Sequence, residues 1–252
     1  MSFVVAADSY DRFMGRYSRL LAPLFADFAG VAAPMDVLDV GCGPGALTTE
    51  LVERLGVASV TAVDPSAPFV EAVKERHPGM DVHRAPAEDL PFDAACFDAA
   101  LAQLVVHHMS DAVTGMGEMR RVTRPGGTVA ACVWDLGSGR DPLSPLWRAV
   151  KRYDPDARDE SGLPGTKEGH LVEIAEAAGL DDVRGEGLTF DVEHASFEEW
   201  WEPFKLGVGP AGAYVAGLAP EQQAELASIC REELATAPFT LSLRAWAAKG
   251  EA

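Results

Sequence analysis

The sequence predicts an α/β protein with a doubly wound, mostly parallel sheet and helices on both of its faces. Two observations carry this prediction. From residue 37 onward, short apolar stretches of strand length alternate with amphipathic stretches of helix length, which is typical of parallel strands joined by right-handed crossovers. In addition, the first strand runs directly into a glycine-rich turn at 41–45 and then into a helix.

The predicted elements follow in order along the chain. Strands are expected at about 37–40, 59–64, 81–84, 97–102, 127–134, 183–192 and 239–247. Helices are expected at about 46–55, 66–76, 111–122 and 167–178. Leu47 and Leu51 share one face of the first helix. Gly179 suits the C-cap of the last of these helices, and Leu241 and Leu243 alternate as in a strand.

Three segments lie outside this alternation, and we interpret them as additions to a single domain spanning residues 1–252. An N-terminal helical segment is expected at about 9–29. The stretch 135–166, rich in Gly, Pro and Asp, predicts a loop with a short helix around 146–152. Apolar residues at helical spacing in 196–236 predict a helical lid over a substrate site.

The charge balance narrows the partners of this protein. The chain has 39 Asp and Glu against 21 Lys and Arg, a formal net charge of −18. Such a surface repels phosphate backbones and anionic headgroups, so we expect neither nucleic acid nor a membrane as partner. We interpret the basic cluster Arg120, Arg121 and Arg124 as favourable charge at a helix C-terminus. No transmembrane run and no secretory signal are visible.

Four dispersed cysteines show no zinc-type spacing, so no metal site is expected. Reduced thiols and a cytoplasmic location are the plain interpretation.

The turn after the first strand predicts a nucleotide-like ligand, because glycines let a ligand touch the backbone and a helix N-terminus favours an anionic group. Two cofactors compete. Gly41 to Ala46 fits the dinucleotide pattern, and Asp64 stands 23 residues beyond Gly41 (64 − 41), near the position of a ribose-binding acid. Asp39 favours S-adenosylmethionine, because a carboxylate repels a pyrophosphate and attracts an ammonium group. Strand alternation leaves open which way Asp39 faces.

Five segments in family-like order and spacing make the chain resemble the class I S-adenosylmethionine-dependent methyltransferases, in particular the branch acting on small molecules, which includes quinone-biosynthesis C-methyltransferases. The segments are Val37 to Gly45, Ala62 to Ser66, Ala87 to Phe92, Phe97 to Ala100, and Glu118 to Gly127. They cover about residues 36–134. The resemblance implies a Rossmann-like seven-stranded sheet with an antiparallel last strand.

The resemblance also implies a set of cofactor contacts: the turn residues Gly41, Cys42, Gly43 and Gly45, then Asp39, Asp64, Pro65, Ala87, Glu88, Gln103 and Leu104. Asp64 would accept the ribose hydroxyls, and Ala87 and Glu88 would meet the adenine. The sequence departs from the family at Pro86, where relatives often carry Asp. Gln103 and Leu104 would lie by the methionine portion, where Gln103 is alternatively an ordinary buried polar residue.

Histidines and the N-terminal segment supply further candidates. His107 and His108 follow the fourth strand, where one of them would accept a proton from the acceptor; alternatively they pack against the next helix. Arg16 would pair with the methionine carboxylate from an N-terminal segment folded over the cofactor, or else lie on a surface helix. Trp200 and Trp201 are adjacent, so we expect only one of them to face the core.

These observations predict methyl transfer by direct displacement from S-adenosylmethionine, with S-adenosylhomocysteine as product, to a small-molecule acceptor whose O, C or N atom is the nucleophile. A monomer or homodimer is expected. Two alternatives stay open at this point: an NAD(P)-dependent oxidoreductase on the same first motif, and a non-catalytic binder of S-adenosylmethionine.

Overall fold

The computed structural model describes residues 7–234 and 236–252. In that part of the chain, the strands form one seven-stranded sheet of order β3-β2-β1-β4-β5-β7-β6. They are β1 (Val37–Val40), β2 (Val60–Val63), β3 (Asp81–His83), β4 (Phe97–Gln103), β5 (Thr123–Trp134), β6 (Asp181–His194) and β7 (Phe239–Glu251). The predicted α/β class is confirmed, and the strand order reverses between β1 and β4.

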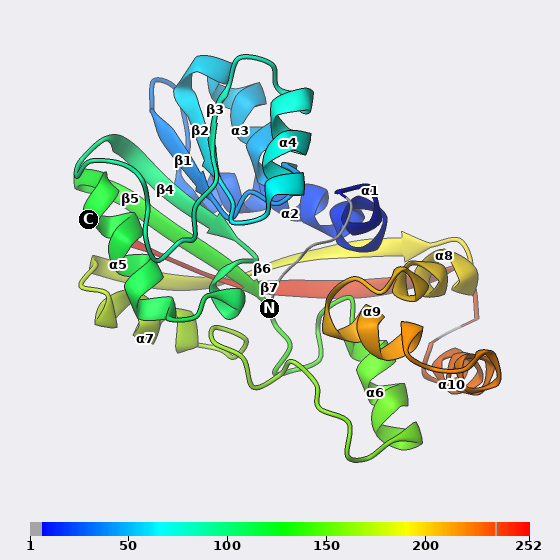
Figure 1. The fold of residues 1–252 in the computed structure, drawn as a ribbon. Coiled ribbons are helices and arrows are strands. Elements are labelled where there is room, and N and C mark those ends of the chain that lie inside the picture. The colour runs from blue at the N-terminus through cyan, green and yellow to red at the C-terminus, as the bar shows by residue number, and fades with distance from the viewer. Residues whose placement is uncertain (1–6, 235) are drawn as a thin grey trace.

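Ten α-helices lie within the described residues: α1 (Ala7–Tyr10), α2 (Arg16–Ala29), α3 (Ala46–Leu55), α4 (Ala67–Arg76), α5 (Ala112–Val122), α6 (Ser144–Tyr153), α7 (His170–Ala177), α8 (Phe197–Trp201), α9 (Gly209–Ala216) and α10 (Pro220–Glu233). A π-helical turn (Asp11–Gly15) joins α1 to α2, and 3₁₀ turns cover Val57–Ser59, Val106–His108 and Glu202–Leu206. Figure 1 shows helices α8, α9 and α10, which belong to the segment expected to form a lid, gathered at one end of the molecule, away from α5 and α7.

The last two strands differ in direction from the rest. Parallel pairing joins β3, β2, β1, β4 and β5, whereas β7 pairs antiparallel with both β5 and β6. The antiparallel last strand is therefore confirmed. Both strands run longer than predicted: β6 gains two residues at each end, and β7 continues to Glu251 opposite Thr128 of β5. Past the end of β5, β6 and β7 pair only with each other, as far as His194 opposite Phe239. The result is a two-stranded arm that carries the lid (Figure 1).

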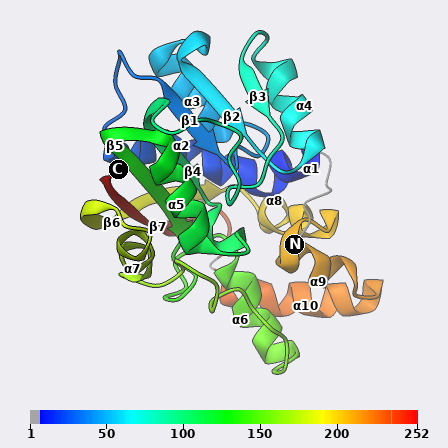
Figure 2. The ribbon, with the colours of Figure 1, turned by 60° about the vertical axis from the view of Figure 1, so that its left-hand side comes forward.

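Side-chain alternation along β1 divides the core into two layers. Val37 belongs to the layer that includes α2, α3 and α4, whereas Leu38 and Val40 belong to the layer with α5 and α7. Because successive strand residues face opposite sides, Asp39 shares the face of Val37 and points towards α3. The second view shows α5 and α7 on the opposite side of the sheet from α2 and α3 (Figure 2).

Trp200 and Trp201 contradict the expectation that only one of them faces the core. They are 2% and 3% exposed. Helix α8 is short and is covered from more than one side, so both rings find a packed environment. The indole N–H of Trp200 donates to the carbonyl of Pro142 at 3.3 Å, and the ring of Trp201 stacks on Phe197. Neither ring is left for an exposed oligomer contact.

The basic cluster is partly as predicted, since Arg120 and Arg121 lie in the last turn of α5. Arg121 pairs with Glu118 on the same helix and donates to the carbonyls of Leu90 and Phe92. Arg124 lies in β5 and pairs with Asp98. Besides lying at or near a helix C-terminus, Arg121 and Arg124 therefore connect the loop after β3 and strand β4 to the α5–β5 connection.

Candidate active site

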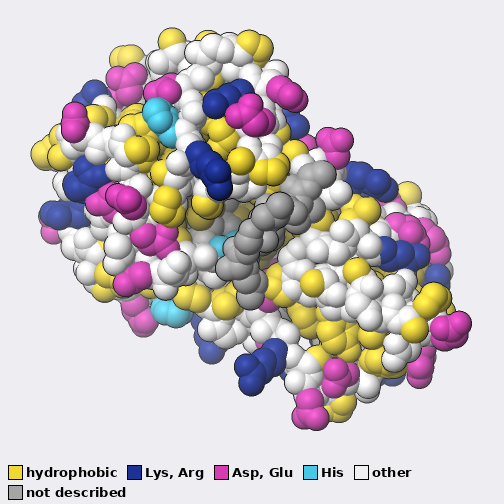
Figure 3. Space-filling view, in the orientation of Figure 1, with side chains coloured by type: hydrophobic (Ala, Val, Ile, Leu, Met, Phe, Trp, Pro, Cys, Tyr) yellow, Lys and Arg dark blue, Asp and Glu magenta, His cyan; other side chains and the backbone are white. Residues whose placement is uncertain are grey.

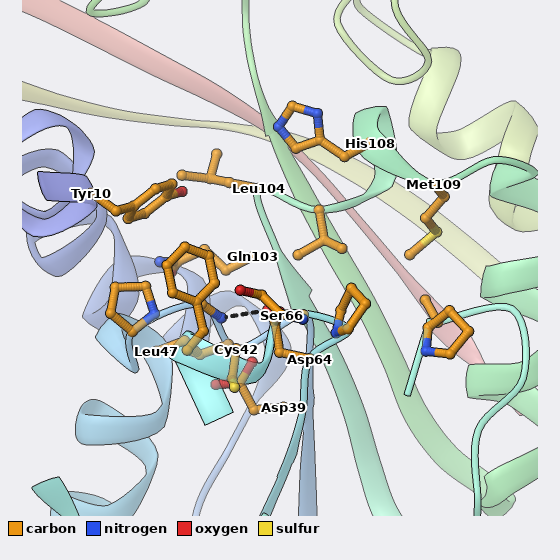
Figure 4. A pocket seen from close by; sticks show the side chains of 18 of the residues that line it. Tyr10, Asp39, Cys42, Leu47, Asp64, Ser66, Gln103, Leu104, His108 and Met109 are labelled. Atoms are coloured by element: carbon orange, nitrogen blue, oxygen red, sulfur yellow. Dashed lines mark hydrogen bonds between the residues drawn. The ribbon is translucent and has the colours of Figure 1, made fainter. Parts of the chain in front are cut away.

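A cavity of about 680 Å³ lies at the carboxyl ends of β1, β2 and β4. This is the edge of an open α/β sheet where ligands bind, at the reversal of strand order. Its walls include Asp39, Gly41, Cys42, Gly43, Asp64, Pro65, Ala87, Glu88, Gln103, Leu104 and His108, all residues that the sequence predicted for the site. Figure 4 shows Asp39, Cys42 and Asp64 near one end of this cavity and Tyr10, Leu104 and His108 near the other.

The glycine turn uses its glycines for different purposes. The N–H groups of Gly41 and Cys42 both donate to the carbonyl of Val63, at 2.7 and 3.0 Å, which folds the turn against β2. A Cβ at Gly41 would lie 2.6 Å from the Val105 side chain. A Cβ at Gly43 would meet nothing within 4 Å, and Gly43 lines the cavity at φ +53°. Gly43 is thus the place where a ligand can approach the backbone.

Asp64 directly follows β2, and its carboxylate accepts hydrogen bonds from two backbone N–H groups. Oδ2 accepts the N–H of Gly43 at 2.9 Å, and Oδ1 accepts the N–H of Ser66 at 2.8 Å. Each oxygen keeps a second lone pair for a ligand hydroxyl. Burial raises the pKa of Asp64, and the two amide contacts oppose that rise.

Asp39 faces the turn, as the cofactor argument required. It is 1% exposed, lines the cavity and accepts a hydrogen bond from Thr48 Oγ1 at 2.6 Å. Burial raises its pKa to about 7, with Asp64 adding to the rise and Thr48 opposing it. The sequence argument treated Asp39 as a fixed negative charge. The structure corrects this: Asp39 is only partly ionised near neutral pH, and a cationic ligand would complete its ionisation.

The N-terminal segment reaches the cavity, but not through Arg16. Tyr10 and Ser18 line the cavity, and the ring of Tyr10 packs edge-on against Phe69 of α4. Arg16 is absent from the cavity walls among the described residues. Its guanidinium pairs with Glu199 at 2.9 Å and donates to the carbonyl of Glu193, so it joins α2 to the lid. The expected contact of Arg16 with the methionine carboxylate is therefore not supported.

The loop after β3 lines the cavity with Pro86, Ala87 and Glu88. Glu88 Oε1 accepts the N–H of Ser110 at 2.6 Å, so this carboxylate organises the segment that leads into α5. If Glu88 contacts an adenine, the same carboxylate must also keep its hydrogen bond to Ser110.

Gln103 is the last residue of β4, and Leu104 follows it; both line the large cavity. Gln103 donates through Nε2 to the carbonyl of Ser18 at 3.0 Å, while its buried Oε1 has no hydrogen-bond partner among the described residues. Leu104 adopts φ +62°, a conformation that costs a non-glycine residue about 1–2 kcal/mol. Strained backbone of this kind clusters at functional sites.

A second, smaller cavity of about 40 Å³ shares Tyr10, Leu104 and His108 with the first. Its other walls are Phe13, Met14, His107, Trp134, Leu136, Leu143, Glu160, Gly209, Pro210 and Ala211. The lid, the N-terminal segment and the loop 135–166 therefore meet at one small and mostly apolar space. It has room for about three water molecules.

Burial makes the two histidines weak bases. The pKa of His107 is lowered well below its usual value by burial, with His108 adding to the effect. Burial lowers the pKa of His108 to about 4. Their rings lie 3.8 Å apart. Both imidazoles are therefore neutral at physiological pH, and full proton transfer to either is opposed.

Comparison with known proteins decides the family. A methyltransferase of Mycobacterium tuberculosis, Rv3342, whose own activity is uncharacterised, is 34% identical over 177 residues, which cover 69% of this chain and 70% of that one. The chain belongs to the class I S-adenosylmethionine-dependent methyltransferases. The family described as "Methyltransferase domain" matches residues 38–131 of this methyltransferase, which span β1 to β5 and hence the glycine turn.

Two further similarities bear on this methyltransferase. Malonyl-[acyl-carrier protein] O-methyltransferase of Pseudescherichia vulneris is 36% identical over 150 residues, 59% of this chain and 58% of that one. The chain covers 49% and 62% of two further proteins of that name, about half of their length or somewhat more. The YcgJ protein of Bacillus subtilis superimposes with a TM-score of 0.58 at 18% identity, over 94% of this chain and 98% of that one, which shows a shared fold.

The residues of the large cavity fit S-adenosylmethionine, the cofactor of this family. The volume lies within the range of nucleotide-sized sites. The open space above Gly43 admits a ligand against the backbone, and the unpartnered Oε1 of Gln103 together with Asp39 offers acceptors for an ammonium group. No group of His, Cys, Asp and Glu able to hold a metal ion occurs within the described residues. Among those residues, no helix is long and apolar enough to cross a membrane.

Sequence reasoning missed Glu160 in this methyltransferase. It lies in the loop between α6 and α7, is 7% exposed and lines the small cavity. Burial raises its pKa to about 7, with the Trp147 indole opposing that rise. In the sequence, Glu160 stands among Asp154, Asp156 and Asp159, and no pattern distinguishes it from them.

Proposed function

We propose that this protein transfers the methyl group of S-adenosylmethionine to a small-molecule acceptor whose reacting end enters the small cavity. One observation carries the proposal: a nucleotide-sized cavity over the glycine turn lies next to a small, mostly apolar one, and the two share the wall residues Tyr10, Leu104 and His108. Such a pair of sites suits a donor and an acceptor that must meet.

The cofactor contacts are part of this proposal. Asp64 accepts the ribose hydroxyls, Asp39 and the Oε1 of Gln103 receive the ammonium group, and Gly43 allows close approach of the backbone. The walls contributed by Gly41, Cys42, Pro65, Ala87, Glu88 and Leu104 complete the site. Gly45 acts indirectly, because it precedes α3 at φ +95° and permits the sharp entry into the helix.

The reaction requires no covalent bond between the protein and the transferred methyl group. When bound, S-adenosylmethionine supplies a methyl group already activated by a positively charged sulfur. The side chains must then hold the nucleophile in line and exclude water. Tyr10 and Phe69 cover the donor side, and the neutral rings of His107 and His108 can accept a hydrogen bond from the acceptor.

The O-methyltransferases among the relatives favour an oxygen nucleophile. The named relatives include malonyl-[acyl-carrier protein] O-methyltransferases and a methyltransferase of phthiotriol and phenolphthiotriol dimycocerosates.

Figure 3 shows Lys and Arg scattered among acidic side chains over the described part of one face, in line with a partner other than nucleic acid. The four free cysteines favour a cytoplasmic location. A monomer or homodimer remains our expectation.

The test combines binding and turnover. Calorimetry with S-adenosylmethionine, S-adenosylhomocysteine and NAD should give binding of the first two and none of the third. A methyl-transfer assay over phenols, quinols, amines and carboxylic acids should then find an acceptor among small molecules. Binding of NAD in preference to the sulfonium donor contradicts the proposal. Binding of the donor without transfer to any small molecule, nucleic acid or protein indicates a non-catalytic binder.

A further inference from the structure

The small cavity contains buried polar atoms whose hydrogen-bonding capacity is unused. Glu160 Oε2, His107 Nδ1 and Trp134 Nε1 line this cavity and have no hydrogen-bond partner among the described residues. The indole N–H of Trp147 also has no such partner, and it lies close enough to Glu160 to oppose the rise of its pKa. Glu160, His107 and Trp134 are 7%, 8% and 3% exposed. Burying such groups without a partner is unfavourable, because their hydrogen bonds to water are lost and not replaced. Three on one small cavity indicate a ligand that satisfies them.

The chemistry of these atoms selects the kind of ligand. An indole N–H only donates, a carboxylate oxygen accepts, and an imidazole nitrogen does either, depending on its tautomer. A hydroxyl group has one donor and two lone pairs, so it can donate to Glu160 and accept from Trp134. An ammonium group has three donors and no lone pair, which leaves the indole N–H without a partner. The remaining walls, such as Phe13, Leu136 and Leu143, are apolar.

Among the titratable groups on these walls, Glu160 is the one suited to receive a proton. Burial raises its pKa to about 7, whereas burial lowers the pKa of His108 to about 4 and that of His107 further below its usual value. A base works best when its pKa lies near the operating pH. The histidines therefore suit hydrogen bonding, and the carboxylate suits proton transfer.

The geometry points to Glu160 as the catalytic base of O-methylation of a hydroxyl acceptor, of phenol or enol type, with Trp134 and His107 orienting the hydroxyl group. This inference rests on the proposed function. In the step, the acceptor oxygen forms a bond to the methyl carbon while the carbon–sulfur bond breaks and leaves its electron pair on sulfur. The hydroxyl proton passes to the Glu160 carboxylate, which later releases it to solvent.

The test uses phenol and 4-nitrophenol as probes, because the latter is largely ionised at pH 8 and needs no base. With Glu160→Gln, turnover of phenol should fall about 10²-fold or more, while turnover of 4-nitrophenol should fall less than about tenfold. The amide still accepts a hydrogen bond, so the dissociation constant of phenol, measured by calorimetry without the donor, should stay within a few-fold. With Glu160→Leu, binding of phenol should weaken more than that of toluene.

Glu168→Gln serves as the matched control, because Glu168 is an exposed carboxylate of the same segment and is absent from the walls of both cavities. Turnover of this variant should equal that of the wild type. Turnover of phenol by Glu160→Gln within threefold of wild type, or equal losses with both probes, overturns the assignment. Methyl transfer by the wild type only to acceptors without a hydroxyl group overturns it too, yet leaves the proposed function intact. Failure to bind S-adenosylmethionine refutes the proposed function itself.

Discussion

The backbone N–H of Gly43 donates to Oδ2 of Asp64 at 2.9 Å, and this bond joins the glycine turn after β1 to the end of β2. The other oxygen of the same carboxylate holds the N–H of Ser66 at the start of α4. One side chain therefore fixes two walls of the large cavity, the proposed donor cavity, before any ligand arrives. Such preorganisation lowers the cost of binding.

Asp64→Asn should weaken both the fold and the site. The amide group keeps one acceptor oxygen and presents an NH₂ to a backbone N–H, so one of the two hydrogen bonds is lost. We expect a loss of about 1–3 kcal/mol in the free energy of unfolding, measured by urea titration, and at least tenfold weaker binding of S-adenosylhomocysteine, measured by calorimetry. Asp81→Asn, an exposed carboxylate on β3, should change neither quantity appreciably.

Asp39→Asn should remove a pH dependence of donor binding. The wild-type pKa of about 7 lies above the ordinary value for Asp, so the carboxylate gains its charge only as pH rises towards neutrality. Affinity for S-adenosylmethionine should therefore increase about tenfold per pH unit between pH 5.5 and 6.5 and level off above 7. In Asp39→Asn, which retains an acceptor for Thr48, binding should be weak and nearly independent of pH. A pH-dependent affinity that survives the substitution would falsify the role of Asp39.

The same substitution tests, in the absence of ligand, how the raised pKa of Asp39 makes the stability of the fold depend on pH. A folded-state pKa raised above the unfolded value means that the folded protein holds the proton longer, so Asp39 destabilises the fold progressively as pH rises from about 4 through 7. Asp39→Asn should therefore gain stability relative to wild type at pH 8, by about 2–4 kcal/mol, and little at pH 4. Thermal unfolding at the two pH values measures the difference.

Gly43→Ala should impair binding more than folding. Gly43 and Gly79 both have positive φ, +53° and +86°, and a Cβ at either meets nothing within 4 Å. Each alanine variant should lose about 1–2 kcal/mol of stability through backbone strain. Only Gly43 lines the donor cavity, so only Gly43→Ala should weaken S-adenosylhomocysteine binding, by tenfold or more. Equal affinities in the two variants contradict close approach of the ligand at Gly43.

Arg16→Ala tests the corrected position of that residue. Its ion pair with Glu199 is partly exposed, with 28% and 39% of the two side chains accessible, so the coupling energy in a double-mutant cycle with Glu199→Ala should be about 0–1 kcal/mol. Affinity for S-adenosylmethionine should stay within about twofold of wild type. A tenfold loss of affinity for S-adenosylmethionine would indicate a direct contact between Arg16 and the cofactor.

The sequence predicted the strands and helices around the glycine turn well, because these elements follow local rules. Apolar runs, the spacing of Gly41, Gly43 and Gly45, and acids at strand ends identified β1, β2 and the cavity between them. Helix α3 occupies the predicted range 46–55. The orientation of Asp39 required the structure, because the sequence of β1 does not show which face of the sheet each of its alternating side chains occupies.

Helices in the N-terminal segment, around 146–152 and in 196–236 were predicted and are present. The side chains around the small cavity were not predicted, because their arrangement depends on contacts between distant segments. Glu160 acquires its importance from burial against residues of the N-terminal segment and the lid, and no local pattern encodes that burial. Arg16 was misplaced for a similar reason: its partner, Glu199, lies 183 positions away (199 − 16). Trp200 and Trp201 are both buried because a short helix can be enclosed by its neighbours, which helical spacing alone does not show.

The lid leaves the sheet at His194 and returns at Phe239, and these two residues pair with each other across the antiparallel arm. Residues 195–238 are thus an insertion between two ends that the pairing of β6 with β7 already fixes. A segment attached in this way can be exchanged or lengthened without disturbing the register of any strand. A chimaera that carries another lid between these two anchor points should still grip the same methyl donor while accepting a different compound, which makes this hairpin a natural grafting site for redesign.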